Sequence, residues 1–217
     1  MRTQWSKFLV MGVALFALIL AGCTSDKKEI KPKSDEMHAK ETTEREKMIS
    51  ELIKNKPEPA PIQAAPGSAA YKRNLLDQIY QDLMRYNNLN VPPIRDARTD
   101  ELINRVLFDF DKANLRDEYT RALSDEAKFV LAEIERRGDM YLQVEGHADN
   151  RGSNEYNLTL GHKRANSVND FLKPYSTQPS TYLKTVSFGE EFPSVEGNNE
   201  AAWSQNRRVI FTLMLRK

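Results

Sequence analysis

The chain has 217 residues, a length that suits one domain with additional segments. Its formal net charge is +1, and residues 101–217 contain 16 Lys and Arg against 18 Asp and Glu, so the sequence argues against a nucleic-acid partner, which favours a basic face. The single cysteine, Cys23, excludes an intramolecular disulfide.

Residues 1–22 have the features of a bacterial lipoprotein signal peptide. Arg2 and Lys7 make the start basic, and an apolar run follows from Phe8 to Leu20, too short to span a bilayer comfortably. The sequence Leu20-Ala21-Gly22-Cys23 then resembles the lipobox, in which the cysteine sulfur is diacylated before cleavage. We therefore expect residues 1–22 to be removed and Cys23 to carry the lipid, because two or more acyl chains give stable membrane attachment.

A tether of low apolar content is predicted after the lipid anchor. Thr24 rather than Asp follows the cysteine, which in the enterobacterial sorting rule implies release to the outer membrane. Residues 24–58 are rich in charge and cannot bury enough surface to offset their ordering entropy. Residues 57–67 are rich in Pro and Ala, as in an extended linker. The sequence therefore predicts that acylated Cys23 and a disordered tether occupy residues 23–68.

An amphipathic helix is predicted over residues 69–88, and Val91-Pro92-Pro93 ends it. Its apolar stripe consists of Tyr71, Leu75, Leu76, Ile79, Tyr80 and Leu83. Three interpretations fit this stripe: the helix packs on its own domain or pairs weakly with itself, it docks on an envelope partner, or it belongs to a disordered segment. Residues 69–100 are therefore expected to contain this helix and a linker.

From residue 101 the pattern alternates between strands and helices. Strands are predicted near Val106–Phe110 and over Tyr141–Gly146, Tyr182–Phe188 and Arg208–Leu215, where apolar and polar side chains alternate. One helix is predicted over Arg116–Arg137, with Gly138 as its C-terminal stop, and another begins after a capping residue, Ser153. Two βα units followed by two strands indicate an α/β sandwich, a sheet with helices on one face, in residues 101–217.

Two charged residues flank the second predicted strand-loop-helix connection. Asp149 lies in the loop, and Arg164 lies on the helix that the loop opens. A short connection can fold this helix back beside the strand, so the two side chains can face one crevice. Such a pair suits a zwitterion, because the carboxylate takes an ammonium and the guanidinium binds a carboxylate in a fork.

The same stretch resembles the OmpA-like peptidoglycan-binding domain family, and within it the peptidoglycan-associated lipoproteins. The resemblance covers about residues 104–215 and is carried by four motifs in order. The longest spans residues 146–166, from Gly146-His147-Ala148-Asp149 to Arg164-Ala165-Asn166. Before it comes Phe108-Asp109-Phe110-Asp111-Lys112, and after it come Gly189-Glu190-Glu191-Phe192-Pro193 and Asn206-Arg207-Arg208. The family resemblance implies a mixed four-stranded sheet. It also implies a lipid-anchored protein on the periplasmic face of the outer membrane that binds peptidoglycan without catalysis. Such a protein is expected to bind TolB of the Tol system and to act in envelope constriction during cell division.

The resemblance further implies a ligand site. Asp149 and Arg164 match positions that hold the diaminopimelate of the peptidoglycan stem peptide. The positions that match Phe110, Asp111, Asn157 and Leu160 line the same crevice. Arg207 and Arg208 are expected to stabilise the fold, through Asp109 or a helix carboxylate, rather than to contact the ligand. The family normally needs no metal or cofactor.

Two other functions remain open at this stage. The domain could anchor a motor, secretion or appendage complex to the wall, with the helix over residues 69–88 as its docking surface. An enzyme is the other alternative, with His147, Asp149 and His162 as metal ligands. We expect no metal site, because the family normally needs none and His162 lies in the variable part of the helix motif. We expect no catalysis, because no nucleophile-elbow serine and no glycine-rich phosphate loop occurs in the sequence.

Overall fold

A computed structural model describes residues 58–88 and 95–216, together with residues 47, 50, 51, 54 and 55. The predicted signal peptide, Cys23 and most of the predicted tether lie outside these residues. Pro61–Lys217 form one compact unit, which contains every element discussed below. Within the described part of the chain, no helix combines the length and the apolar character needed to cross a membrane.

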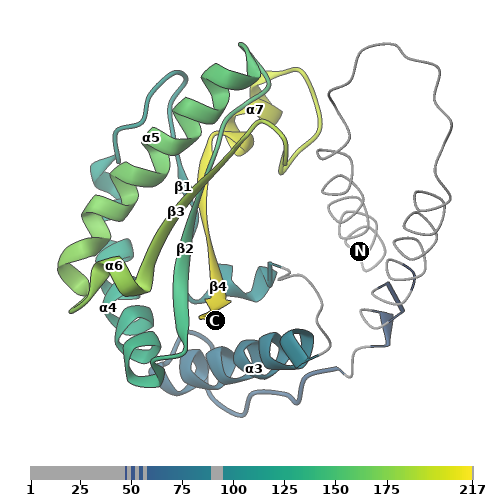
Figure 1. Ribbon diagram of the computed structural model, residues 1–217, viewed down its shortest axis with the longest axis vertical. Helices are drawn as coiled ribbons and strands as arrows, with labels where there is room; N and C mark the ends of the chain where they lie inside the picture. The colour runs from purple at the N-terminus through teal and green to yellow at the C-terminus, as the bar shows by residue number, and fades with distance from the viewer. Residues whose placement is uncertain (1–46, 48–49, 52–53, 56–57, 89–94, 217) are drawn as a thin grey trace, which may run out of the picture. The chain divides into compact units, whose positions relative to one another are not determined.

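The centre of this unit is a mixed four-stranded sheet, as the family resemblance implied. Its strands are β1 (Val106–Leu107), β2 (Met140–His147), β3 (Leu183–Gly189) and β4 (Arg208–Leu215), in the spatial order β1-β4-β2-β3. Strands β2 and β3 run parallel, whereas β4 pairs antiparallel with both β1 and β2. The last strand of the chain therefore lies inside the sheet, between its first and second strands (Figure 1).

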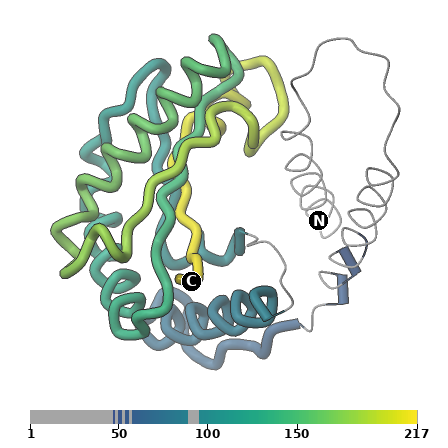
Figure 2. The backbone as a smooth tube through the Cα atoms, viewed as in Figure 1, coloured from purple at the N-terminus to yellow at the C-terminus, as the bar shows by residue number. Residues whose placement is uncertain are grey.

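Two long helices, α4 (Asp117–Arg137) and α5 (Asn154–Leu172), lie along one face of the sheet (Figures 1 and 2). Ser153 caps α5, since its hydroxyl accepts a hydrogen bond from the Tyr156 backbone N–H. Gly138 ends α4 with φ 80°, a conformation that glycine adopts without strain. The remaining elements are α3 (Ala69–Asn88), η1 (Ala97–Glu101), η2 (Lys173–Tyr175), α6 (Pro179–Tyr182) and α7 (Glu200–Asn206).

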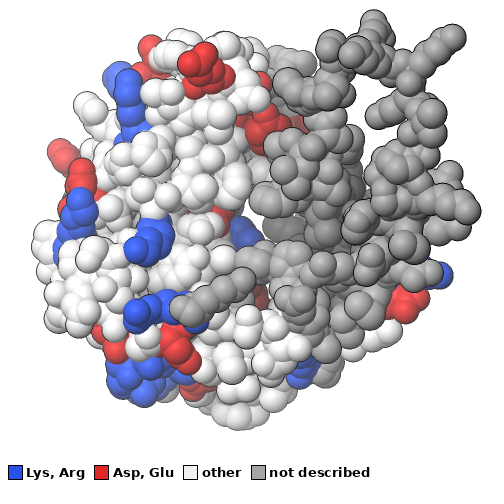
Figure 3. Space-filling view, viewed as in Figure 1, with Lys and Arg blue, Asp and Glu red and all other residues white. Residues whose placement is uncertain are grey.

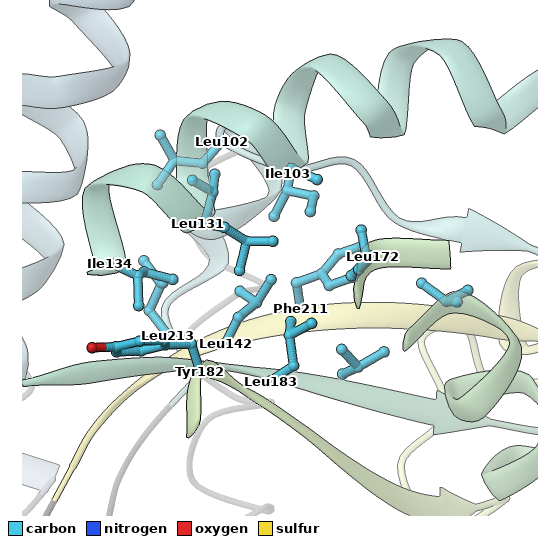
Figure 4. Packing of buried hydrophobic residues seen from close by; sticks show 14 of the residues in the cluster. Leu102, Ile103, Leu131, Ile134, Leu142, Leu172, Tyr182, Leu183, Phe211 and Leu213 are labelled. Atoms are coloured by element: carbon cyan, nitrogen blue, oxygen red, sulfur yellow. The ribbon is translucent and has the colours of Figure 1, made fainter. Parts of the chain in front are cut away.

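The main core lies between these helices and the sheet. Alternation along β2 puts Met140, Leu142 and Val144 on one side of the strand, and all three are fully buried. Figure 4 shows Leu131 and Ile134 of α4 packed over Leu142 and Leu213 of the sheet. Burial of such side chains stabilises the fold by about 1.5–3 kcal/mol each.

Strand β1 is shorter than the alternating pattern of residues 106–110 predicts. The strand ends at Leu107, and Phe110 is 57% exposed. After Phe108 the backbone carbonyls bind arginine side chains instead of a neighbouring strand, because Arg207 Nε donates to the Phe108 oxygen and Arg164 Nη2 to the Asp109 oxygen. The prediction of a strand through Phe110 is therefore wrong, and the segment forms a turn.

Helix α3 packs within the same core as the sheet. Leu75, Leu76, Ile79 and Leu83 are buried and belong to one cluster with residues of α4, β2 and β4. Of the three interpretations of this stripe, packing on its own domain is the one that the structure shows. The compact unit accordingly begins near Pro61, earlier than the residue 101 at which the sequence pattern placed the start of the domain.

Polar contacts flank the apolar stripe of α3. Arg73 Nε donates to Glu133 Oε1 of α4 at 2.9 Å, and Tyr80 Oη donates to Asp139 Oδ2 at 2.5 Å. Asp77 pairs with Arg137 at the C-terminal end of α4. These partners place α3 at the end of the sheet where β2 begins.

Helix α5 lies unusually close to β2 at a pair of glycines. A Cβ atom built on Gly146 would lie 1.8 Å from the Gly161 backbone oxygen, and one on Gly161 would lie 2.3 Å from Ser187 Oγ. No larger residue fits at either position without moving the helix. This close approach fixes the start of α5 beside the end of β2, where the candidate site is found.

We predict that Leu76→Ala lowers the free energy of unfolding by about 2–5 kcal/mol, because the side chain is fully buried and a cavity replaces it. Urea denaturation followed by circular dichroism measures this change. Leu158→Ala, at a side chain that is 41% exposed on α5, is the matched control and should change stability by less than about 0.5 kcal/mol. Equal effects of the two substitutions would show that α3 is not part of the core.

Candidate functional site

A cavity of about 210 Å³ opens where β2 ends and α5 begins. Five of the six ligand residues implied by the family resemblance line it, namely Phe110, Asp111, Asp149, Asn157 and Leu160. Arg151, Gly152 and Tyr156 complete the lining, whereas Arg164 does not contribute to it. The structure therefore brings the expected residues together around one cavity, with Arg164 behind them.

Asp149 supplies a buried carboxylate that is 4% exposed. Arg151 donates to it from the backbone N–H at 3.2 Å, from Nε at 3.0 Å and from Nη2 at 2.8 Å, and Arg207 Nη1 donates at 3.3 Å. Burial alone would raise the pKa of Asp149, but these hydrogen bonds outweigh it and the pKa is lowered. The group is therefore an anion at neutral pH.

Arg151 is the one cation among the lining residues of this cavity. Its guanidinium carbon lies 4.0 Å from the ring centroid of Phe110 and 4.1 Å from that of Trp203, so two aromatic rings sandwich it. The side chain remains 30% exposed. Arg151 thus presents a positive charge at the cavity while it neutralises the carboxylate of Asp149.

Arg164 is fully buried and binds backbone carbonyls. Its Nε donates to the Lys112 oxygen at 2.8 Å, Nη1 to the His147 oxygen at 2.9 Å and Nη2 to the Asp109 oxygen at 3.2 Å. Burial lowers the pKa of Arg164 to about 10, so the guanidinium keeps its proton at neutral pH. The two charges that the sequence suggested as one crevice-facing pair are thus arranged differently: Asp149 lines the cavity and Arg164 supports its wall.

The wall that Arg164 supports is the turn of residues 109–112. Asp111 in this turn has φ 58°, a left-handed conformation that is uncommon outside glycine. The hydroxyl of Tyr156 on α5 hydrogen-bonds the Asp111 carboxylate. Arg164 from inside and Tyr156 from outside therefore hold the turn against α5.

Asn157 and Leu160 belong to the first turns of α5. Asn157 is 1% exposed, and its Nδ2 donates to the Arg151 oxygen at 3.0 Å and to Glu190 Oε2 at 2.7 Å. This amide fixes the loop that carries Arg151, whereas Leu160 adds apolar surface to the cavity. Asn157 therefore contributes to the site chiefly by ordering its backbone.

The arrangement suits a ligand that carries both charges and a short apolar part. A ligand ammonium can replace Arg151 on the carboxylate of Asp149, and the released guanidinium can bind a ligand carboxylate. Nowhere in the described part of the chain do three or more His, Cys, Asp or Glu side chains gather as a metal site would require. The chemistry that this geometry supports is recognition of a zwitterion.

Sequence reasoning missed three members of the site. Arg151 and Tyr156 lie inside the motif that carries the resemblance, but their contacts are visible only in three dimensions. Arg151 contacts Asp149 and Phe110, and Tyr156 hydrogen-bonds Asp111. Arg207 was expected to pair with Asp109 or a helix carboxylate. It pairs with a helix carboxylate, Glu200 of α7, and it also binds Asp149, whereas Asp109 pairs with Lys112 and Arg116.

His147 occupies a second buried polar environment, on the side of β2 opposite Val144. The ring is 2% exposed, stacks on Phe188 with centroids 5.7 Å apart, and lies 4.0 Å from Glu145. Neither ring nitrogen has a hydrogen-bond partner among the described residues. Burial, together with the charges of Arg208 and Arg95, holds the pKa of His147 well below its usual range.

Surface charge around the domain is mixed. Figure 3 shows Lys and Arg lying beside Asp and Glu over the described part of one face. Ion pairs of the domain include Arg73–Glu133 and Lys173–Asp170. This face therefore lacks the single-sign field that attracts a nucleic-acid backbone.

Comparison with known proteins finds the OmpA family over residues 107–207. A peptidoglycan-associated lipoprotein of Pasteurella multocida is 42% identical over 107 residues, which are 49% of this chain and 68% of that protein. The protein of the same name from Haemophilus influenzae is 40% identical over 107 residues, 49% of this chain and 67% of its own length. The match extends over only 62% of a third such lipoprotein, from Brucella melitensis, at 36% identity.

Among solved structures, the chain is similar to the peptidoglycan-associated lipoprotein from Burkholderia pseudomallei. The sequences are 34% identical, and the similarity covers 51% of this chain and 89% of that one, with a TM-score of 0.46. The segment that matches the family includes β2, β3, α4, α5 and the residues that line the cavity. Helix α3 and η1 precede the segment that matches the family.

We predict that His147→Gln makes the protein less sensitive to acid. In the folded chain the ring stays neutral, whereas the unfolded chain binds a proton below about pH 6.5, so the free energy of unfolding falls as the pH falls below that value. The loss is at most about 1.4 kcal/mol per pH unit. Urea denaturation at about pH 7 and pH 5 should show a smaller loss for His147→Gln than for the wild type.

The control for this measurement is His162→Gln, because His162 is exposed on α5. That variant should keep the full loss of stability. Glu145, whose pKa burial raises, acts in the opposite direction in all three proteins. Equal losses in His147→Gln and the wild type would contradict a neutral buried ring.

Proposed function

Because the chain belongs to the OmpA family and its relatives are named peptidoglycan-associated lipoproteins, we propose that it binds peptidoglycan without catalysis and links the cell wall to the outer membrane. The observation that carries this proposal is the cavity in which the buried carboxylate of Asp149 meets the partly exposed guanidinium of Arg151. The cavity lies within the segment that matches the family.

The ligand proposed for this cavity is the diaminopimelate of the stem peptide. Its side chain ends in an ammonium and a carboxylate on the same carbon, so it offers the two charges that the cavity complements. Asp149 takes the ammonium. The carboxylate meets the positive charge of Arg151 and the turn of residues 109–112, with the ring of Phe110 beside it.

Arg164 is proposed to act on this ligand through the turn. Three N–H groups of its guanidinium bind the backbone carbonyls of Asp109, Lys112 and His147, and these contacts support a role in holding residues 109–112 at the ligand. Its buried charge also favours an anion in the cavity. A lysine ammonium is a single point charge on a flexible stem and cannot bridge the same three groups.

The anchor is proposed to be the acylated Cys23, which places the protein on the periplasmic face of the outer membrane. Between Cys23 and Pro61 runs a chain that spans on the order of 30 Å as a flexible coil and about 120 Å when extended. TolB is the proposed protein partner, by analogy with the role of the family in the Tol system and cell division. That analogy also underlies the expectation that palmitate is among the attached lipids.

A lipoprotein that anchors a motor, secretion or appendage complex would use the same wall-binding site. Its expected docking surface was the apolar stripe of α3. Leu75, Leu76 and Ile79 of that stripe are 0–2% exposed within their own unit, so they are not available to a partner while α3 is docked. We therefore prefer the linkage of membrane to wall.

We predict that residues 61–217 bind a diaminopimelate stem peptide more tightly than the matching lysine peptide or a peptide with the distal carboxylate amidated. Either change removes a charge-assisted interaction, which costs about 1.5–3 kcal/mol, or roughly ten- to over a hundredfold in affinity. Isothermal titration calorimetry with the three peptides measures the difference. Equal affinities for all three would refute the proposed ligand.

Two substitutions extend this test. Arg164→Lys should bind no better than Arg164→Ala, because neither side chain holds the turn. Lys163→Ala, at the exposed neighbouring residue on α5, is the matched control and should bind like the wild type. Pull-down with purified sacculi should rank the same variants in the same order.

We predict that Cys23→Ser abolishes lipidation, because no thioether can form. Cells fed labelled palmitate should label the wild-type protein alone, and the variant should accumulate uncleaved or leave the membrane fraction. Equal incorporation of palmitate into both proteins would contradict the anchor. This outcome is independent of the cavity, so it separates the two halves of the proposed function.

A further inference from the structure

Helix α3 is the element through which the tether enters the folded unit. It follows Pro61, where the unit begins, and it precedes the segment shared with the family, which starts at residue 107. Under the proposed function, tension between the membrane and the wall therefore reaches the domain first at the N-terminal end of α3. The inference below rests on that function for the direction of the load.

The docking place of α3 and the ligand cavity lie at opposite ends of β2. Asp77 and Tyr80 of α3 contact Arg137 and Asp139, directly before β2 begins. The cavity begins with Asp149, directly after β2 ends at His147. A strand of this length separates the two places by roughly 25 Å, and Figure 1 shows α3 and the start of α5 at the two ends of the sheet.

The contacts of α3 differ in kind from those that hold the sheet. Beside its four buried apolar side chains, α3 is attached by two ion pairs with a half-exposed member, since Arg73 is 53% exposed and Asp77 is 51% exposed, and by the less exposed pair of Asp82 with Arg98. Such pairs contribute little individually. Strands β2 and β4 instead share a continuous ladder from Met140↔Leu215 to Gly146↔Val209.

The direction of loading adds to this difference. A pull on the N-terminal end of α3 detaches the helix turn by turn, so only a few contacts resist at any moment. A pull along β2 and β4 loads all of their backbone hydrogen bonds together. Release of α3 also leaves α4 and α5 packed on the sheet, where Leu142, Leu172 and Phe211 remain covered (Figure 4).

We propose that α3 is a strap that releases under tension before the sheet and the cavity open. Its release lengthens the tether while the domain keeps its ligand. About 30 residues, from Gln63 to Arg95, then become part of the tether, and at 3.3–3.6 Å per residue they add on the order of 100 Å of chain. The domain thus yields at the end that faces the membrane and stays closed at the end that faces the wall.

The test is single-molecule force spectroscopy on the full chain. Cys23→Ser removes the only native cysteine, so Gln63→Cys and Glu155→Cys supply two specific handles, one at the tether entry and one exposed at the start of α5. We expect two events, first a release of about 100 Å of chain at low force and then unfolding of the rest at higher force. A single event that releases both portions together would overturn the proposal.

Two matched core substitutions assign the events. Leu76→Ala in α3 should shorten the lifetime of the first event at constant force by about tenfold or more and leave the second unchanged. Val168→Ala, equally buried but on α5, should do the reverse. If both variants change the same event, α3 is not a separate strap. If Leu76→Ala does not fold, Arg73→Gln serves in its place, because it removes only the pair with Glu133. It should shorten the lifetime of the first event by a smaller factor and leave the second event unchanged.

These measurements contain no peptidoglycan, so they are independent of the ligand assignment. Failure of the domain to bind sacculi would refute the proposed function and leave the two events in place. A single unfolding event beside normal sacculus binding would refute the strap alone. A chain with Leu76→Ala should retain the affinity of the wild type for sacculi, because α3 lies away from the cavity.

Discussion

The buried guanidinium of Arg164 is the interaction on which the site depends. It joins the carbonyls of Asp109 and Lys112 to that of His147, two segments far apart in the sequence. Burying a charged group costs folding free energy unless its hydrogen bonds are made. The fully buried guanidinium therefore stabilises only those structures in which these three carbonyls lie within hydrogen-bond distance. The turn of residues 109–112, the end of β2 and the helix that carries Arg164 are therefore fixed together, and the cavity is the space left between them.

Local sequence signals predicted most of the fold. Gly138 as a stop, Ser153 as a cap and the strand pattern of residues 208–215 act over a few residues, and the structure confirms the stop, the cap and the strand. The alternation after Leu107 was misleading, because side chains of Arg164 and Arg207, distant in sequence, capture the carbonyls that a strand would use. Periodicity reports which side chains are apolar, and it carries no information about such distant partners.

The site illustrates the same limit. Both Asp149 and Arg164 could be singled out as charged residues in a strand-loop-helix connection. Their separate roles depend on which side chain lines the cavity and which is buried behind its wall, and a single sequence does not show this. In the sequence Arg151 cannot be told from any other charged loop residue, because its position between the rings of Phe110 and Trp203 requires three segments to meet. The stripe of α3 was equally clear in the sequence, whereas the surface that it covers was not.

The place of β4 in the sheet has a consequence for how the protein is made. This strand follows β1 and β2 in the sequence and lies between them in the sheet, so neither of those strands has its antiparallel partner until residues 208–215 have been synthesised. Arg207, which binds Asp149 and the Phe108 carbonyl, arrives equally late. A chain that emerges N-terminus first, from a ribosome or a translocation channel, therefore cannot close its sheet prematurely. The four-stranded sheet is thus completed by an element that follows β1, β2 and β3 in the sequence.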